Sequence, residues 1–168
     1  MRQAGVTLIE LMIVILIIGL IAMAASPFTS VWVKDARMAE AAAALEQAVG
    51  KAKSTAMRNA TRVTGDAPAS MLCLSASKTK VSLVAPATPG GGLTCDITPI
   101  WSVSLAEIVS VKTLDSSDVA TDWSCSCFNN KGLPTKTGAQ CTACSNSLRF
   151  KFSHDGHSGD EGDTRNFF

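Results

Sequence analysis

Apolar side chains form an almost continuous run from Val6 to Ala25, interrupted by the polar residues Thr7 and Glu10. A run of about 20 apolar residues is about 30 Å long as a helix, which is enough to cross the hydrocarbon core of a membrane. A carboxylate inside such a segment costs about 3 kcal/mol and needs a compensating partner. The pattern therefore predicts a membrane-inserted N-terminal helix in which Glu10 has a task that a plain anchor would not require.

The helical period continues after this run, but the pattern becomes amphipathic. Apolar residues recur at intervals of seven, four and three, which places them on one narrow helix face. These residues are Val31, Met38, Leu45, Val49, Ala52 and Ala56. We predict one helix from about Val6 to about Asn59, about 80 Å long. A kink or a melted turn is expected at Pro27, because the proline ring removes a backbone hydrogen bond.

From Val63 onward, short runs that alternate apolar and polar residues indicate β-strands. The expected strands are 71–75, 80–85, 99–105, 108–114, 122–128 and 147–153. Proline, glycine and asparagine mark a loop at 86–92 and a turn at 129–132. We predict an α+β fold in which an antiparallel sheet packs on the apolar stripe of the long helix, because this arrangement buries the apolar faces of both.

Composition narrows the possible functions. The chain has 168 residues and a formal net charge of +1, so there is room for about one small domain after the apolar run. From residue 63 onward, eight basic side chains stand against ten acidic ones, and direct DNA binding is therefore disfavoured. The remaining candidates for a local basic patch are Lys131, Lys136, Arg149 and Lys151.

The C-terminal segment contains residue types that are found in metal and catalytic sites. His154, His157 and the acidic residues at 155, 160, 161 and 163 lie in a glycine-rich stretch, where no helical spacing preorganises them. The sequence 156–159 also lacks the spacing of a nucleophile elbow. We interpret this segment as a solvated loop and predict a structural protein, not an enzyme, with no catalytic residue, metal or cofactor.

All six cysteines follow the apolar run: Cys73, Cys95, Cys125, Cys127, Cys141 and Cys144. An even number in an exported domain predicts disulfides formed in an oxidising compartment. We favour Cys73 with Cys95, and Cys125 and Cys127 paired across to Cys141 and Cys144. A Cys125–Cys127 bond is disfavoured on the premise that the two side chains leave opposite faces of a strand. The rival interpretation is a zinc site made of the last four thiolates, which export disfavours.

Residues 5–14, Gly5-Val6-Thr7-Leu8-Ile9-Glu10-Leu11-Met12-Ile13-Val14, resemble the N-terminus of type IV pilins and pseudopilins. The resemblance implies that a prepilin peptidase cleaves after Gly5 and that Val6 is N-methylated. It also implies that Glu10 is the assembly glutamate and Pro27 the helix-breaking proline. In a staggered bundle, the Glu10 carboxylate can meet the new Val6 amine of a neighbouring subunit, which removes the cost of an unpaired buried charge.

A second resemblance concerns residues 52–63 and 128–134. Ala52-Lys53-Ser54-Thr55-Ala56-Met57-Arg58-Asn59 with Arg62-Val63 looks like the helix end of the GspH/FimT-type pilin-like domain. Phe128-Asn129-Asn130-Lys131-Gly132-Leu133-Pro134 resembles the turn of that domain. The FimU-type minor pilins are the most similar in kind. The resemblances imply a type IV pilin fold with a leader at 1–5, a membrane and filament-core helix at 6–27, an amphipathic helix at 28–62 and a disulfide-bonded β-rich domain at 63–168.

This family implies a minor pilin that helps to prime a type IV pilus and lies at or near its tip, with roles in twitching motility, adhesion or DNA uptake in natural transformation. The expected partners are major and minor pilins, the prepilin peptidase and the inner membrane. The protein would be a single-pass membrane protein with a periplasmic domain before assembly and part of the cell-surface pilus afterwards.

Three alternatives are open from the sequence. A GspH-like pseudopilin of a type II secretion system would share every feature described above. A DNA-binding pilin is disfavoured by the acidic C-terminal segment. An exported soluble protein is the third alternative, because Ala22-Met23-Ala24 fits the small-x-small rule of a signal-peptide cleavage site. In that last case, the apolar segment would simply be discarded.

Overall fold

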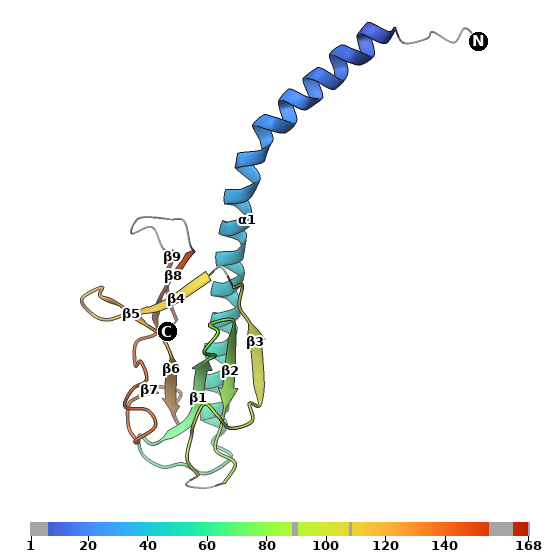
Figure 1. The fold of residues 1–168 in the computed structure, drawn as a ribbon. Helices are drawn as coiled ribbons and strands as arrows, with labels where there is room; N and C mark the ends of the chain where they lie inside the picture. The colour runs from blue at the N-terminus through green and yellow to red at the C-terminus, as the bar shows by residue number, and fades with distance from the viewer. Residues whose placement is uncertain (1–6, 89–90, 108, 155–162, 168) are drawn as a thin grey trace. The chain divides into compact units, whose positions relative to one another are not determined.

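The computed structural model describes residues 7–88, 91–107, 109–154 and 163–167, with only the backbone for 24–31. One long helix, α1 (Leu8–Arg58), precedes nine strands in the described chain (Figure 1). The strands are β1 (Pro68–Leu74), β2 (Lys80–Val84), β3 (Trp101–Ser104), β4 (Val109–Leu114), β5 (Ala120–Asp122), β6 (Cys125–Asn129), β7 (Pro134–Thr135), β8 (Arg149–His154) and β9 (Asp163–Asn166). The chain divides into two compact units, Met1–Ala36 and Arg37–Phe168.

The ends of α1 are set by side-chain caps. At the N-terminus, the Thr7 hydroxyl accepts a hydrogen bond from the Glu10 backbone N–H at 3.4 Å, and this cap precedes the first helical residue, Leu8. At the C-terminus, Asn59 has a φ of 44°. Its amide group donates to the Val63 carbonyl at 2.8 Å and accepts from the Val63 N–H at 2.7 Å, which ends the helix at Arg58.

Pro27 does not interrupt the helix. α1 is continuous from Leu8 to Arg58, so the prediction of a melted turn at Pro27 is wrong. Proline removes one N–H donor, and the helical backbone on both sides of it continues.

The strands form two antiparallel sheets where the sequence suggested one. The first sheet has the order β3-β2-β1-β6-β7, and the second has the order β5-β4-β8-β9. The expected strand 122–128 is in fact two strands, because β5 pairs with β4 in the second sheet whereas β6 pairs with β1 in the first. Trp123 lies between them with 3% of its surface exposed, and the chain changes sheets at this buried residue.

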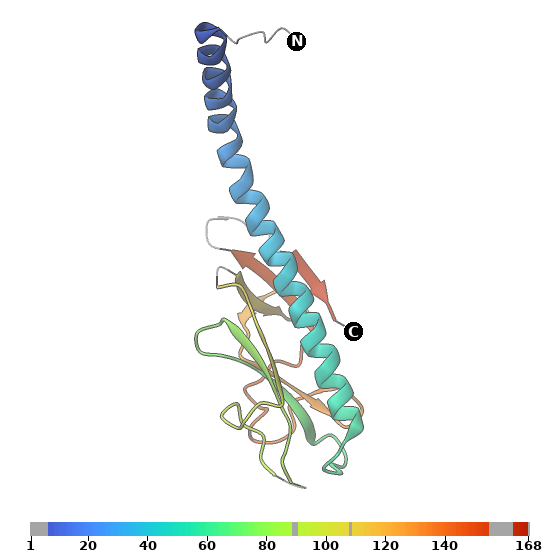
Figure 2. The same ribbon diagram turned by 90° about the vertical axis from the view of Figure 1, so that its right-hand side faces the viewer.

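The core of unit Arg37–Phe168 forms where the stripe on α1 meets both sheets. Leu45, Val49, Ala52 and Ala56 are buried, and Met38 packs against them half-buried; the Val31 side chain lies outside the described residues. They share one cluster with side chains from the two sheets, including Leu72, Phe128, Phe150 and Phe152. In Figure 2 this part of α1 crosses in front of the strands. The predicted α+β architecture, a long helix packed on antiparallel sheets, is confirmed and is consistent with the type IV pilin fold.

The first sheet is covered on its other face as well. Met71 and Cys73 of β1 belong to a second buried cluster, whereas Leu72 between them belongs to the helix-facing core. In β6, Cys125 and Cys127 belong to this second cluster together. The premise that these two cysteines leave opposite faces is therefore wrong, because residues two apart along a strand point to the same face.

Candidate assembly helix and disulfide-bonded core

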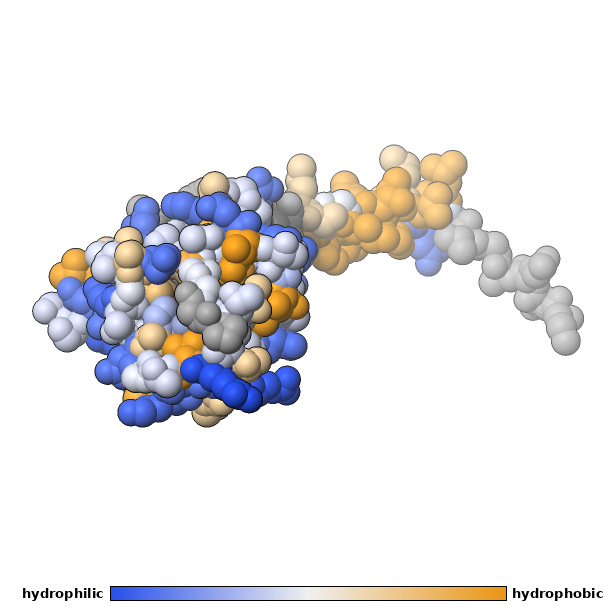
Figure 3. Space-filling view, turned by 90° about the horizontal axis from the view of Figure 1, so that it is seen from below, coloured by the Kyte–Doolittle hydropathy of each residue, from blue (hydrophilic) through white to orange (hydrophobic). Residues whose placement is uncertain are grey.

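Residues 8–23 of α1, called here the apolar segment, expose apolar side chains on all sides. The large apolar side chains of this segment have exposed fractions between 47% and 80%. In Figure 3 this part of the helix is mostly orange, whereas the visible face of the compact unit is mainly blue and white. A helix exposed to water would carry a polar face. The apolar segment therefore needs a covering of lipid or of other protein chains.

Glu10 is the charged residue of this segment, and it lies in the first turn of α1. A carboxylate here is favoured by the positive end of the helix dipole. The spacing Thr7-x-x-Glu10 is that of a capping box, but only the Thr7 half is formed, through the hydrogen bond from the Glu10 N–H. Within the described chain, the exposed Glu10 carboxylate has no hydrogen-bond or ion-pair partner. It is therefore available to a group outside the subunit.

The remaining residues of the predicted processing and assembly site are not described in full. Gly5 and Val6 lie outside the described residues, and for Pro27 only the backbone is described. Cleavage after Gly5, methylation of Val6 and a role for Pro27 in assembly stay predictions. Among the residues that the structure describes, no helix is both long enough and apolar enough to span a bilayer.

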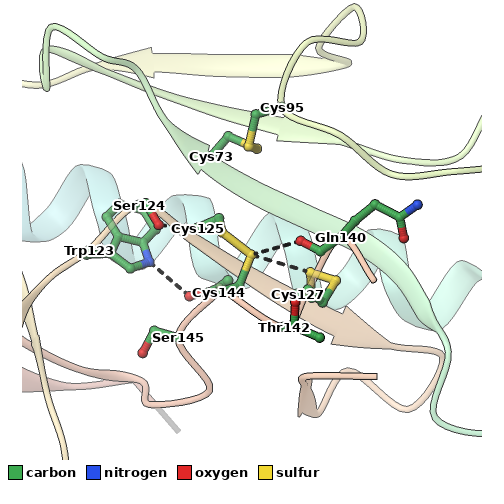
Figure 4. The surroundings of a disulfide bond; sticks show 12 residues. Cys73, Cys95, Trp123, Ser124, Cys125, Cys127, Gln140, Thr142, Cys144 and Ser145 are labelled. Atoms are coloured by element: carbon green, nitrogen blue, oxygen red, sulfur yellow. Dashed lines mark hydrogen bonds between the residues drawn. A yellow bond between two sulfur atoms is a disulfide. The ribbon is translucent and has the colours of Figure 1, made fainter. Parts of the chain in front are cut away.

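All six cysteines lie in the described chain, and they form three disulfides. Cys73 is bonded to Cys95, Cys125 to Cys144 and Cys127 to Cys141, with Cα–Cα distances of 5.6, 4.8 and 6.0 Å. These distances lie in the usual range of about 4.4–6.8 Å. The last two bonds are neighbours, since the Cys127 and Cys144 sulfur atoms are 3.9 Å apart (Figure 4). Disulfides thus form much of the second buried cluster.

These bonds leave the rival zinc site without thiolates. Cys125, Cys127, Cys141 and Cys144 are consumed in pairs, and a metal-bound cysteine must be a thiolate. In the parts of the chain that are described, no group of three or more His, Cys, Asp or Glu side chains is placed to hold a metal ion. Of the candidate residues at the C-terminus, His154 is buried at the end of β8, Asp163 begins β9, and residues 155–162 lie outside the described residues.

The two segments that resemble the GspH/FimT-type domain meet at Val63. The Val63 carbonyl accepts hydrogen bonds from the Asn59 side chain at 2.8 Å and from the Asn130 side chain at 3.0 Å. The predicted turn is closed by the Gly132 N–H, which donates to the Asn129 carbonyl at 2.8 Å. Gly132 has a φ of 74°, and a Cβ on it would lie 3.3 Å from the Met57 side chain. The positive φ therefore favours glycine here, and a Cβ would require the Met57 side chain to shift.

Two hydrogen bonds between the helix and the rest of the compact unit were not predicted from the sequence. The buried Ser70 hydroxyl donates to the Ala52 carbonyl at 2.8 Å. The half-buried Lys53 ammonium donates to the Phe167 carbonyl at 3.4 Å, and desolvation by burial lowers the pKa of Lys53. In the suggested basic patch, Arg149 is already paired, because it forms an ion pair with Asp118.

The comparisons with known proteins give one positive finding. Residues 1–26 match the family model described as the prokaryotic N-terminal methylation motif. No similar protein was found among curated proteins, and no similar structure among solved structures. The matched motif supports a type IV pilin-like protein, processed by prepilin peptidase and assembled with other pilins into a pilus or pseudopilus, and it indicates a structural protein of the pilin type.

Proposed function

We propose that this chain is a minor pilin of a type IV pilus, which helps to prime assembly and lies at or near the tip. The observation that carries the proposal is the pairing of a methylation motif at residues 1–26 with a helix whose apolar side chains are exposed from residue 8 to residue 23. A helix of this kind is suited to lipid before assembly and to a bundle of apolar helices in a filament afterwards.

In the proposed assembly step, the Glu10 carboxylate pairs with an amine that cleavage creates. Cleavage after Gly5 would leave an amine on Val6, and the exposed Glu10 carboxylate has no partner within the described subunit. In a staggered bundle, Glu10 pairs with the Val6 amine of an adjacent pilin. This pairing compensates a carboxylate that would otherwise be buried alone, which would cost several kcal/mol.

In the proposed cycle, the protein is anchored in the inner membrane by residues 6–27, with the disulfide-bonded domain in the periplasm, and then moves into the pilus at the cell surface. The oxidising compartment is supported by three disulfides in the described chain. The acidic excess after residue 63 argues against direct DNA binding.

Deletion of the gene tests the proposal against a pseudopilin of a type II secretion system. A minor pilin that primes the pilus predicts loss of surface pili and of twitching motility, with protein secretion unchanged. Expression of the intact chain should restore pili. Loss of protein secretion with normal piliation would contradict the pilus assignment and favour the pseudopilin.

A further inference from the structure

A polar groove of about 570 Å³ lies between the β4–β5 hairpin and the loop that carries Cys144. Its lining comes from residues 113–116, 121, 122, 124 and 143–147, together with Lys136. The volume falls in the range of about 300–1,000 Å³ that is common for small-molecule sites. Most such sites are lined mainly by apolar side chains, whereas this lining is dominated by hydroxyl, amide and charged groups. The groove therefore suits a hydrophilic ligand.

The walls of the groove are held in place by bonds within the protein. In the hairpin, the hydroxyl oxygens of Thr113 and Thr121 are 3.2 Å apart and share a hydrogen bond. In the loop, the Cys125–Cys144 disulfide and a 2.9 Å hydrogen bond from the Ser145 N–H to the Cys125 carbonyl fix the chain to β6; the labelled residues of this wall are drawn in Figure 4. A preformed groove requires little ordering when a ligand binds.

Several polar groups that line the groove form no bond within the described part of the chain. Ser116, Lys136 and Asn146 have exposed side chains without a hydrogen-bond or ion-pair partner in the described chain. The Asp115 Oδ1 atom accepts the N–H groups of Ser117 and Val119 at 2.8 and 2.9 Å, and no bond to its Oδ2 atom is found among the described residues. Together these groups offer both donors and acceptors to a ligand.

Charge and polarity limit the class of that ligand. Asp115 and Asp122 line the groove with one cation, Lys136, and Asp122 already pairs with Lys78 and Lys112 at 3.6 and 3.9 Å. A phosphate or sulfate would meet carboxylates without an excess of cations. An apolar ligand would leave polar groups unpaired, at about 1–3 kcal/mol for each group that is fully desolvated.

We propose that this groove binds a neutral saccharide. Each hydroxyl of a sugar is both a donor and an acceptor, which matches the mixture of groups supplied by Ser116, Asn146, Lys136 and Asp115. The inference rests on the groove alone and does not depend on the proposed place of the protein in a pilus. Its failure would leave the assembly proposal intact, and the reverse also holds.

The test is binding of the full-length chain to an array of neutral and anionic glycans, in a detergent without a sugar head group. We expect binding to neutral glycans. The triple variant Ser116→Ala, Lys136→Ala and Asn146→Ala should bind the same glycans at least tenfold more weakly. Inorganic phosphate, added as a competitor at matched ionic strength, should not displace them.

A matched variant, Ser117→Ala with Lys131→Ala, removes a hydroxyl and an ammonium that are exposed and lie outside the groove. It should bind as the unchanged chain does, and circular dichroism spectra of both variants should match that of the unchanged chain. The proposal is overturned if no neutral glycan binds, if phosphate displaces the bound glycan, or if the two variants lose binding equally.

Discussion

The apolar segment at residues 8–23 and the compact unit Arg37–Phe168 use the same kinds of side chain in opposite ways. Large apolar residues of the apolar segment are between 47% and 80% exposed, whereas Leu45, Leu72 and Phe128 of the compact unit are completely buried. The compact unit therefore contains the partners that its apolar surface requires. The described chain supplies none for the apolar segment, so its side chains need partners from outside the subunit. Under the proposed function, these partners are membrane lipid or the helices of a filament.

The two regions also differ in how they are held. The compact unit has three disulfides, and its helix is hydrogen-bonded to Ser70 of β1 and, through Lys53, to Phe167 just after β9. The apolar segment has helical backbone bonds and a Thr7 cap. Substitutions in the compact unit should change folding stability. Substitutions in the apolar segment should change assembly without changing the fold of the compact unit.

The largest expected effect is on assembly. Glu10→Ala should reduce incorporation of the protein into filaments at least tenfold, because the Val6 amine of a neighbour would lose its partner. Immunoblots of sheared pili measure incorporation relative to the amount in the membrane. Glu46→Ala is the matched control, because Glu46 is exposed on α1 and has no ion-pair partner in the described chain. Incorporation of the Glu10→Ala protein at the unchanged level would contradict this account.

Loss of a disulfide should have the largest effect on the compact unit. The Cys125 and Cys144 positions are separated by 19 residues, and a loop of that size gives a stabilisation of about 3 kcal/mol. Cys125→Ser with Cys144→Ser should therefore lower the free energy of unfolding by about 2–4 kcal/mol, measured by denaturant unfolding of the full chain in detergent.

The same comparison has a chemical control. A reductant should destabilise the unchanged protein at least as much as this double substitution does, since it breaks all three bonds. Equal stability of the reduced and oxidised proteins would show that the disulfides do not hold the second buried cluster together.

A smaller effect is expected where the helix joins the first sheet. Ser70→Ala removes the donor to the Ala52 carbonyl, which is buried in the core, and should cost about 1 kcal/mol. Ser102→Ala in β3 is the control, because Ser102 is exposed and its side chain has no partner in the described part of the chain. Equal unfolding free energies for the two variants would mean that this contact does not stabilise the packing of the helix.

The smallest expected effect is a pH dependence that comes from Lys53. Desolvation lowers its pKa in the folded state from an ordinary value of about 10.4. Between the lowered pKa of the folded state and the ordinary pKa of the unfolded state, the unfolded state binds more protons than the folded state. The free energy of unfolding therefore rises with pH in this window. The unchanged protein should gain stability relative to Lys53→Met as the pH rises through this window, in paired unfolding curves. A relative loss would contradict the assigned direction.

Sequence patterns predicted the parts of the fold that have a regular period. The stripe through Leu45, Val49 and Ala52 was visible because a helix buries residues three and four positions apart. β7 was missed because its two residues are too few to alternate, and β9 because Asp163–Asn166 has no apolar position. Such strands form through tertiary pairing with β6 and β8, which no local pattern encodes.

The site was predictable to a similar extent. The run of apolar residues predicted the apolar helix on which the structure places Glu10, whereas the role of Glu10 in assembly stays a prediction. The spacing Thr7-x-x-Glu10 also contained a signal for the N-terminal cap that the sequence analysis did not use. Which partner belongs to Cys125 was left open, since Cys141 and Cys144 lie close together in one loop. The contact of Ser70 with Ala52 depends on how the sheet docks on the helix, and its local sequence carries no sign of it.

Analysis of the N-terminus of the mature protein tests the central claim most directly. The account holds that the apolar segment is retained as a filament helix, and it therefore predicts a mature chain that begins with N-methylated Val6 in the mass spectrum of protein from sheared pili. A chain that begins at Ala25 would contradict it, because the exposed apolar helix would then have been discarded with a signal peptide.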